Sequence, residues 1–182
     1  MYLIDRAAQE HRLAGLVPVE SSTHTIGQHL RDPQTGQEWL LYHALGRQPE
    51  SGPRVLREEH PDLPLTQRLS VCFASGSRDD LVGLAWELSE VPDTWPSMLE
   101  WLEEREALSV EQIALFLGNV TVMGAVNRRS VAGREVGEVL AEFRRYSGLA
   151  ARARHLVEGR ESRRETRPAT PQDESTSGAA QP

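Results

Sequence analysis

The chain contains no lysine and a single cysteine. All 20 basic residues among the 182 are arginine, and Cys72 is the one cysteine. The absence of lysine excludes Schiff-base catalysis and phosphate binding by a P-loop lysine. Arginine does not replace lysine as a base, because its side chain stays protonated in proteins. One cysteine excludes a disulfide within the chain and a cysteine-rich zinc site.

Long apolar runs are also absent. No segment approaches the roughly 20 apolar residues that a membrane-spanning helix needs, and the N-terminal residues show no secretory signal. Hydrophobic residues make up 38% of the sequence, which is an ordinary share for a globular protein once glycine is added. We therefore expect a soluble protein of a bacterial cytoplasm, with no membrane contact, metal or cofactor.

Each part of the chain carries an excess of charge of one sign. Residues 1–124 hold 9 arginines and 19 acidic residues, whereas residues 125–168 hold 11 arginines and 6 acidic residues. This asymmetry indicates that the basic segment meets an acidic surface, a nucleic acid or only solvent. The acidic surface would belong to another protein or to the chain's own body.

The C-terminal residues are poor in large apolar side chains. Residues 159–182 contain no aliphatic residue larger than alanine. Such a segment buries too little surface to offset the entropy lost on folding. We predict a disordered tail over 159–182 and a single α+β domain over 1–158.

The first half of the chain has the pattern of strands. Segments 23–30 and 38–45 flank an Asp-Pro-Gln-Thr-Gly sequence at 32–36, which predicts a tight reversal and an antiparallel hairpin. The second segment is apolar on both faces, so we expect a strand covered on both sides. Residues 46–66 are rich in proline and predict a long loop, and 69–74 predict a further strand.

The second half has helical spacing. Helices are predicted to begin after Ser77, Thr94 and Ser109, although alternation after Ser77 leaves a strand as the alternative there. A longer helix is predicted from Val131, ended or kinked at Gly148. The predicted fold class is α+β, with an antiparallel, sheet-rich N-terminal half packed against a helical C-terminal half.

One predicted helix carries candidates for protein binding. Trp95, Met98 and Trp101 lie close to one helical stripe in an acidic segment. Aromatic residues and methionine are enriched where proteins bind one another. The alternative is that all three are core residues.

Residues 108–129 resemble the helix-turn-helix motif of bacterial regulators. Ala114 is small enough for close helix packing, and Gly118 stands at the position of the turn. The resemblance implies that 120–129 is a recognition helix, in which Asn127, Arg128 and Arg129 are the residues able to contact bases. The alternative is a buried helical hairpin.

The arginines that follow are candidates for phosphate contact. On a continuous helix, side chains spaced in this way form a basic stripe suited to nucleic acid: Arg144, Arg145, Arg152 and Arg154. Glutamates alternate with these arginines in the sequence, so a solvated helix face is the alternative.

No set of residues with the spacing of a catalytic site is present. We therefore expect a non-enzymatic protein-binding module of the adaptor, chaperone-like or inhibitor-like kind, an idea supported by analogy with small acidic α+β chaperones. A homodimer is compatible with this function. The alternative is a nucleic-acid-binding or transcription-regulatory protein that uses the segments 108–129 and 128–154.

Overall fold

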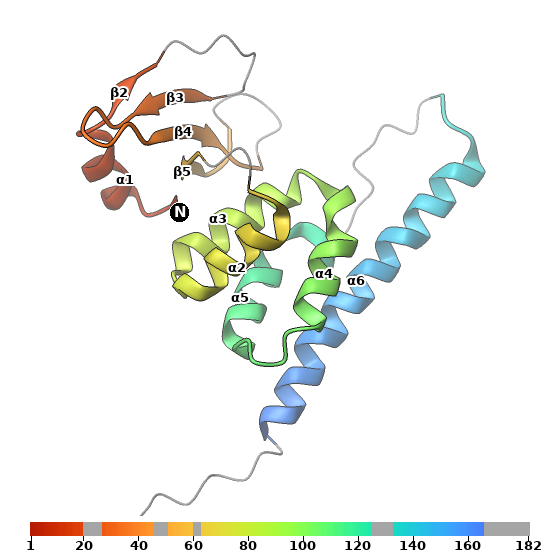
Figure 1. Ribbon diagram of the computed structural model, residues 1–182. Coiled ribbons are helices and arrows are strands. Elements are labelled where there is room, and N and C mark those ends of the chain that lie inside the picture. Colours follow the sequence, from red (N-terminus) through yellow and green to blue (C-terminus); the bar gives the residue numbers. More distant parts are fainter. Residues whose placement is uncertain (20–26, 46–50, 60–62, 125–132, 166–182) are drawn as a thin grey trace, which may run out of the picture.

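The computed structural model describes residues 1–19, 27–45, 51–59, 63–124 and 133–165 (Figure 1). Five strands occupy mainly the first third of the chain: β1 (Tyr2–Leu3), β2 (Val17–Pro18), β3 (Gln28–Arg31), β4 (Glu38–His43) and β5 (Arg54–Glu58). Six α-helices are described: α1 (Arg6–Leu13), α2 (Leu65–Ser75), α3 (Arg78–Ser89), α4 (Trp95–Glu103), α5 (Val110–Asn119) and α6 (Val136–Glu165). Two short 3₁₀ helices are η1 (Pro92–Thr94) and η2 (Thr121–Gly124). The α+β fold class predicted from the sequence is confirmed.

The strands form one antiparallel sheet in the order β1-β5-β4-β3-β2. The predicted hairpin joins β3 to β4, and Leu30 pairs with Trp39 in its register. Its turn is held by the Asp32 carboxylate, which accepts a hydrogen bond from the Gln34 amide at 2.8 Å. Gly36 takes a φ of 75°, a conformation that glycine adopts with little strain. The predicted reversal is therefore confirmed.

Both faces of the sheet are covered, as predicted for the segment that forms β4. Trp39 belongs to a small apolar cluster with Leu16, Leu30 and Leu56. Tyr42 packs on the larger core, which the helices build on the other face. Figure 1 shows α1 beside the sheet on one side and the helical bundle on the other. The domain therefore has a sheet layer between a single helix and a bundle.

The strand predicted at 69–74 is wrong, because these residues lie inside α2. Leu69, Cys72 and Phe73 are buried on one face of this helix with the spacing of helical turns. Pro64 precedes the helix, and Gly76 ends it with a φ of 63°. A six-residue apolar run fits either period, and packing against α3 and α4 selects the helix.

Helices begin after all three predicted residues, but the Thr94 side chain does not cap α4, because its hydroxyl donates to the Val91 carbonyl instead. The Ser77 side chain accepts a hydrogen bond from the Asp80 amide, and Ser109 accepts one from the Gln112 amide. The alternative strand after Ser77 is therefore wrong. Gly148 neither ends nor kinks α6 into two helices, since the helix is continuous over 30 residues.

The predicted tail begins too early. Residues 159–165 form the last turns of α6, and Arg160 in this segment is only 7% exposed. Its guanidinium donates hydrogen bonds to the carbonyl oxygens of Leu102 and Glu106, close to the end of α4. The sequence signal fails here because an arginine, and not an aliphatic residue, does the packing. Residues 166–182 lie outside the described part of the chain.

Candidate functional site

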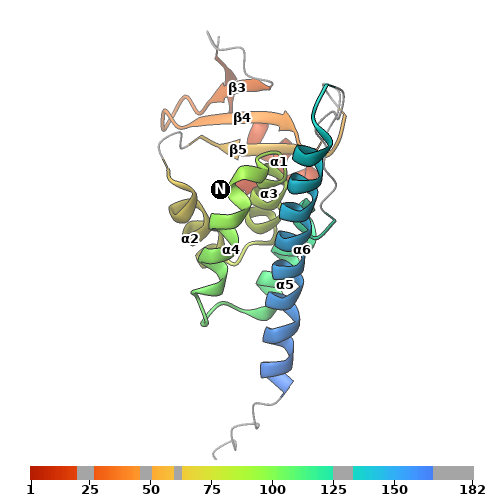
Figure 2. The same cartoon turned by 90° about the vertical axis from the view of Figure 1, so that its right-hand side faces the viewer.

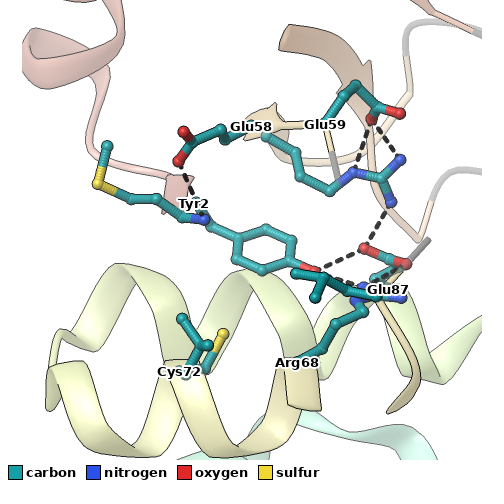
Figure 3. Close-up of a pocket in the computed structure, with 10 residues that line it drawn as sticks. Tyr2, Glu58, Glu59, Arg68, Cys72 and Glu87 are labelled. Carbon is teal, nitrogen blue, oxygen red and sulfur yellow. Dashed lines mark hydrogen bonds and ion pairs between the residues drawn. The ribbon is translucent and has the colours of Figure 1, made fainter. Parts of the chain in front are cut away.

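The structure has a cavity of about 270 Å³ between the sheet and the helices (Figure 3). Side chains from β1, β5, α2 and α3 meet there. Its lining is half apolar and half charged: Met1, Tyr2, Arg57, Glu58, Glu59, Leu63, Arg68, Val71, Cys72 and Glu87. The cavity is the described feature in which ionisable side chains converge, so we take it as the first candidate site.

Local structure explains why these side chains meet. Tyr2 and Arg57 are register partners in the antiparallel pairing of β1 with β5. Arg68 and Cys72 are four residues apart on α2 and share one helical face. Glu87 lies on α3, which runs alongside α2.

The carboxylate of Glu87 is the centre of the site. Its Oε2 accepts a hydrogen bond from the Tyr2 hydroxyl at 2.8 Å and lies 2.7 Å from Nη1 of Arg57. Its Oε1 lies 2.6 Å from Nη2 of Arg68, which also donates to the Tyr2 hydroxyl at 2.6 Å. Arg57 in turn donates from Nε to Glu59 at 3.0 Å. Figure 3 shows this network as a connected chain of dashed contacts.

Burial and charge act in opposite directions on these groups. Burial alone would raise the pKa of Glu87, but the attraction of Arg57 and Arg68 outweighs it and holds that pKa below its usual value. Burial likewise opposes the charge of the two arginines, and the Glu87 carboxylate still raises the pKa of both. All three groups therefore stay ionised at neutral pH.

The Tyr2 hydroxyl and the Cys72 thiol are held in their protonated forms. Burial, and then the charge of Glu87, raises the pKa of Tyr2 far above its usual value. Burial, with the charge of Asp80, raises the pKa of Cys72 to about 12. A thiol is a good nucleophile only as a thiolate. The network is therefore suited to holding β1 against the helices, and not to activating a nucleophile or a base.

Two further carboxylates, at the start of α3, bind the same strand. Asp80 accepts a hydrogen bond from the Tyr2 amide at 2.6 Å, and Asp79 accepts one from the Ile4 amide at 2.9 Å. Asp80 is only 4% exposed. Nothing in the spacing of two adjacent aspartates signals the edge strand that they contact.

Metal binding receives no support from the described side chains. In the described ranges, no group of three or more histidine, cysteine, aspartate or glutamate side chains is placed to hold a metal ion. No described helix combines the length and apolar character that crossing a bilayer requires.

The protein-binding candidates Trp95, Met98 and Trp101 are core residues. Their exposed fractions are 4%, 0% and 4%. The Trp95 indole donates from Nε1 to the Leu88 carbonyl at 2.7 Å, and its ring contacts Tyr146 edge-on at a centroid distance of 5.6 Å. The structure therefore agrees with the alternative, because this stripe packs against α2 and α6 instead of facing solvent.

The described part of the helix-turn-helix-like segment does not form a recognition helix. After α5, the chain continues as the short 3₁₀ helix η2. Val120 and Val122 are buried in the main core, so these residues have no surface to offer to DNA. Asn127, Arg128 and Arg129 lie outside the described residues.

The four arginines of the predicted stripe all lie exposed on α6. Arg152 donates from Nη2 to Glu103 of α4 at 2.7 Å, and Arg145 lies 3.6 Å from Asp93. The basic segment thus meets the chain's own acidic body at Arg145 and Arg152, which was one of the alternatives.

The sequence analysis missed an apolar stripe on the same helix. Val136, Leu140 and Phe143 are 75%, 49% and 56% exposed. Both views show α6 along the outside of the bundle, and in Figure 1 its first turns extend beyond α4, away from the sheet (Figure 1, Figure 2). The buried residues of α6 begin at Tyr146 and include Leu149, Ala150 and Ala153. They lie on a different face of the helix from the exposed apolar stripe. The change from one face of the helix to the other can be recognised from the spacing of the apolar residues in the sequence.

Comparison of the chain with protein-family models, with curated proteins and with solved structures found no match.

Proposed function

We propose that this chain is a non-enzymatic protein-binding module whose docking surface is the apolar stripe of Val136, Leu140 and Phe143. The exposure of these three large side chains on one helical stripe is the observation that supports the proposal. Water contact with contiguous apolar surface is unfavourable, and such patches on soluble proteins mark sites of interaction. Adaptor, chaperone-like and inhibitor-like proteins all use surfaces of this kind.

The chemistry of the cavity supports a non-enzymatic function. The Glu87 carboxylate is held between two guanidinium groups, and the Cys72 thiol has a pKa of about 12. A general base or nucleophile needs a pKa near the working pH and access to a substrate. Neither group meets both conditions.

Nucleic-acid binding is the weaker alternative. It requires cations that are free to contact phosphates. Arg145 and Arg152 instead lie against Asp93 and Glu103 of the same chain. The described start of the helix-turn-helix-like segment is buried, so the alternative depends on residues 125–132, which lie outside the described part.

Site-specific photocrosslinking in the native host tests the proposal. A photoreactive amino acid at Leu140 is expected to give discrete protein adducts. The same amino acid at Val17, which is 46% exposed on β2 and lies outside both the stripe and the cavity, is the matched control and is expected to give none of them. Adding Phe143→Glu to the Leu140 probe should remove the adducts. No adduct at Leu140, or the same adducts at both positions, would count against a docking surface on α6.

A further inference from the structure

We propose that the partner of this stripe is a second copy of the same chain, bound through an antiparallel pair of α6 helices. This inference rests on the proposed function, since it names the occupant of the same surface. Val136, Leu140 and Phe143 are separated by four and then three residues, and Ser147 continues the series. These are the d, a, d and a positions of a heptad, the spacing with which two helices pack side chains into one another.

The stripe is complementary to itself when the two helices run in opposite directions. In the register that pairs Leu140 with Phe143 of the second copy, each copy contributes one leucine and one phenylalanine to the centre. Val136 then lies opposite Ser147 of the second copy at both ends. All large exposed side chains of the stripe are covered in this register, and no charged residue lies in the seam.

The charges along α6 favour the antiparallel direction. Residues 133–142 carry Arg134 and three glutamates, whereas residues 143–154 carry four arginines and no acidic residue. In this antiparallel register, residues 133–142 of one copy lie along residues 141–150 of the other, so Glu138 lies level with Arg145 of the second copy. Parallel pairing would place like charges together, and it would also align the two helix dipoles unfavourably.

The edge of the seam leaves room for the partner helix. An added Cβ at Gly137 would meet no atom within 4 Å, so the space beside this residue is open. In the antiparallel register, Arg144 of the second copy lies next to Gly137. Its aliphatic stem can cover this gap while the guanidinium stays in water.

The size of the stripe sets the expected affinity. A stable interface buries about 800 Å² on each partner, and three exposed side chains over two helical turns supply only part of that area. We therefore expect a weak dimer that forms with rising concentration, not a permanent one.

Analytical ultracentrifugation of the whole chain over roughly three decades of concentration tests the association. The wild type is expected to shift from monomer to dimer. Phe143→Glu is expected to raise the dissociation constant by about tenfold or more, because it places a carboxylate in the apolar seam. Val17→Glu changes a valine of similar exposure on β2, outside the stripe and the cavity, and should leave the dissociation constant unchanged. Circular dichroism and thermal unfolding verify that both variants are folded.

Disulfide trapping tests the direction of the helices. In a Cys72→Ser background, Val136→Cys and Ser147→Cys are made as separate proteins and mixed under mild oxidation. The antiparallel register predicts the mixed disulfide between the two variants. Homodimers of Val136→Cys with itself would indicate a parallel pair and overturn the proposed arrangement.

The outcomes separate the two proposals. A chain that stays monomeric at every concentration, while the photoreactive group at Leu140 gives adducts with other proteins, overturns self-pairing and leaves the docking surface in place. Adducts with twice the mass of the 20.3 kDa chain support self-pairing. A monomeric chain without any adduct at Leu140 overturns both.

Discussion

Glu87 connects three elements through one carboxylate, since its partners Tyr2, Arg57 and Arg68 lie on β1, β5 and α2. Its side chain is 17% exposed, and those of the two arginines are 23% and 24% exposed. Ion pairs shielded to this extent are screened less than surface pairs. If the carboxylate were absent, two guanidinium groups would face each other with their shared counter-charge removed.

Glu87→Gln is expected to lower the free energy of unfolding by about 3 kcal/mol, because it leaves buried charge unpaired. Urea denaturation monitored by tryptophan fluorescence measures the change. Glu10→Gln, which breaks the exposed pair with Arg6, is the control and should cost less than about 1 kcal/mol. Equal effects of the two substitutions would show that the buried network contributes no more than a surface pair.

The same carboxylate predicts a dependence on pH. The pKa of Glu87 is lowered in the folded state, so the unfolded state binds more protons in acid. Its contribution to stability is complete above about pH 4.3, the ordinary glutamate value, and is lost as the pH falls below that through the folded pKa. The difference in unfolding free energy between wild type and Glu87→Gln should therefore shrink only below about pH 4.3. A difference that already shrinks between pH 5 and 7 would contradict the lowered pKa.

Gly83 on α3 allows β1 to approach the helix. An added Cβ at this position would lie 2.5 Å from Cβ of Tyr2, an atom next to the backbone that cannot rotate away. Gly83→Ala is therefore expected to lower stability by about 1–3 kcal/mol despite the better helix propensity of alanine.

Gly148→Ala on α6 is the matched control for Gly83→Ala, because an added Cβ there meets no atom within 4 Å. It should raise stability by up to about 1 kcal/mol, since alanine favours helix more than glycine does. Thermal unfolding of both variants measures the two signs. A stabilised Gly83→Ala would show that β1 can move away from α3 at little cost.

Individual elements differ in how far the sequence determines them. The hairpin from β3 to β4 is predictable because Pro33 and Gly36 restrict the backbone locally. The caps at Ser77 and Ser109 are predictable for the same reason, as each side chain bonds an amide three residues away. In contrast, α2 was predicted as a strand, because Leu69 to Phe73 fit both periods and only tertiary packing decides.

The functional surfaces were harder to predict than the elements. The sequence predicts the helix that carries Trp95, Met98 and Trp101. Helical spacing does not show whether the core of the same chain or another protein covers such a stripe. The Glu87 network joins residues up to 85 positions apart, and no local pattern records such contacts. The apolar stripe of α6 lies within a segment of helical spacing, but that spacing does not show which helix face is covered by the bundle.

The last turns of α6 belong to the folded domain. Arg160 donates to the Leu102 carbonyl at 2.9 Å and to the Glu106 carbonyl at 3.0 Å. A chain ending at residue 158 is therefore expected to be less stable than one ending at residue 165 by about 2 kcal/mol, since carbonyl groups near the end of α4 lose their donors. Chemical denaturation of the two truncated chains measures the difference. Equal stabilities would show that residues 159–165 add nothing to the stability of the fold, as the predicted boundary at 158 implies.

Across the whole molecule, charge is distributed so that α6 lies against an acidic body. Arg152 pairs with Glu103, and Arg163 lies 3.8 Å from Glu106. The segment richest in arginine is thus partly neutralised by the chain that carries it. The positive electrostatic field that reaches a distant polyanion is therefore weaker than the number of arginines in this segment suggests.

We therefore expect no retention of the protein on duplex DNA at low salt. Arg152→Ala should lower stability slightly through loss of its pair with Glu103, without changing behaviour on DNA. Electrophoretic mobility shift and heparin chromatography measure this. Binding that weakens steeply with salt would instead support the nucleic-acid alternative.

Because Cys72 is buried, the rate at which it reacts with a thiol reagent reports opening between the sheet and the helical bundle. The only thiol in the chain is 3% exposed and lines the cavity between the sheet and the helical bundle. Burial slows the reaction of this thiol with a reagent, so a higher labelling rate indicates that the sheet and the bundle separate more often. Tracking this rate needs no dye or engineered tag, and in Gly83→Ala it should rise while the rate in Gly148→Ala does not.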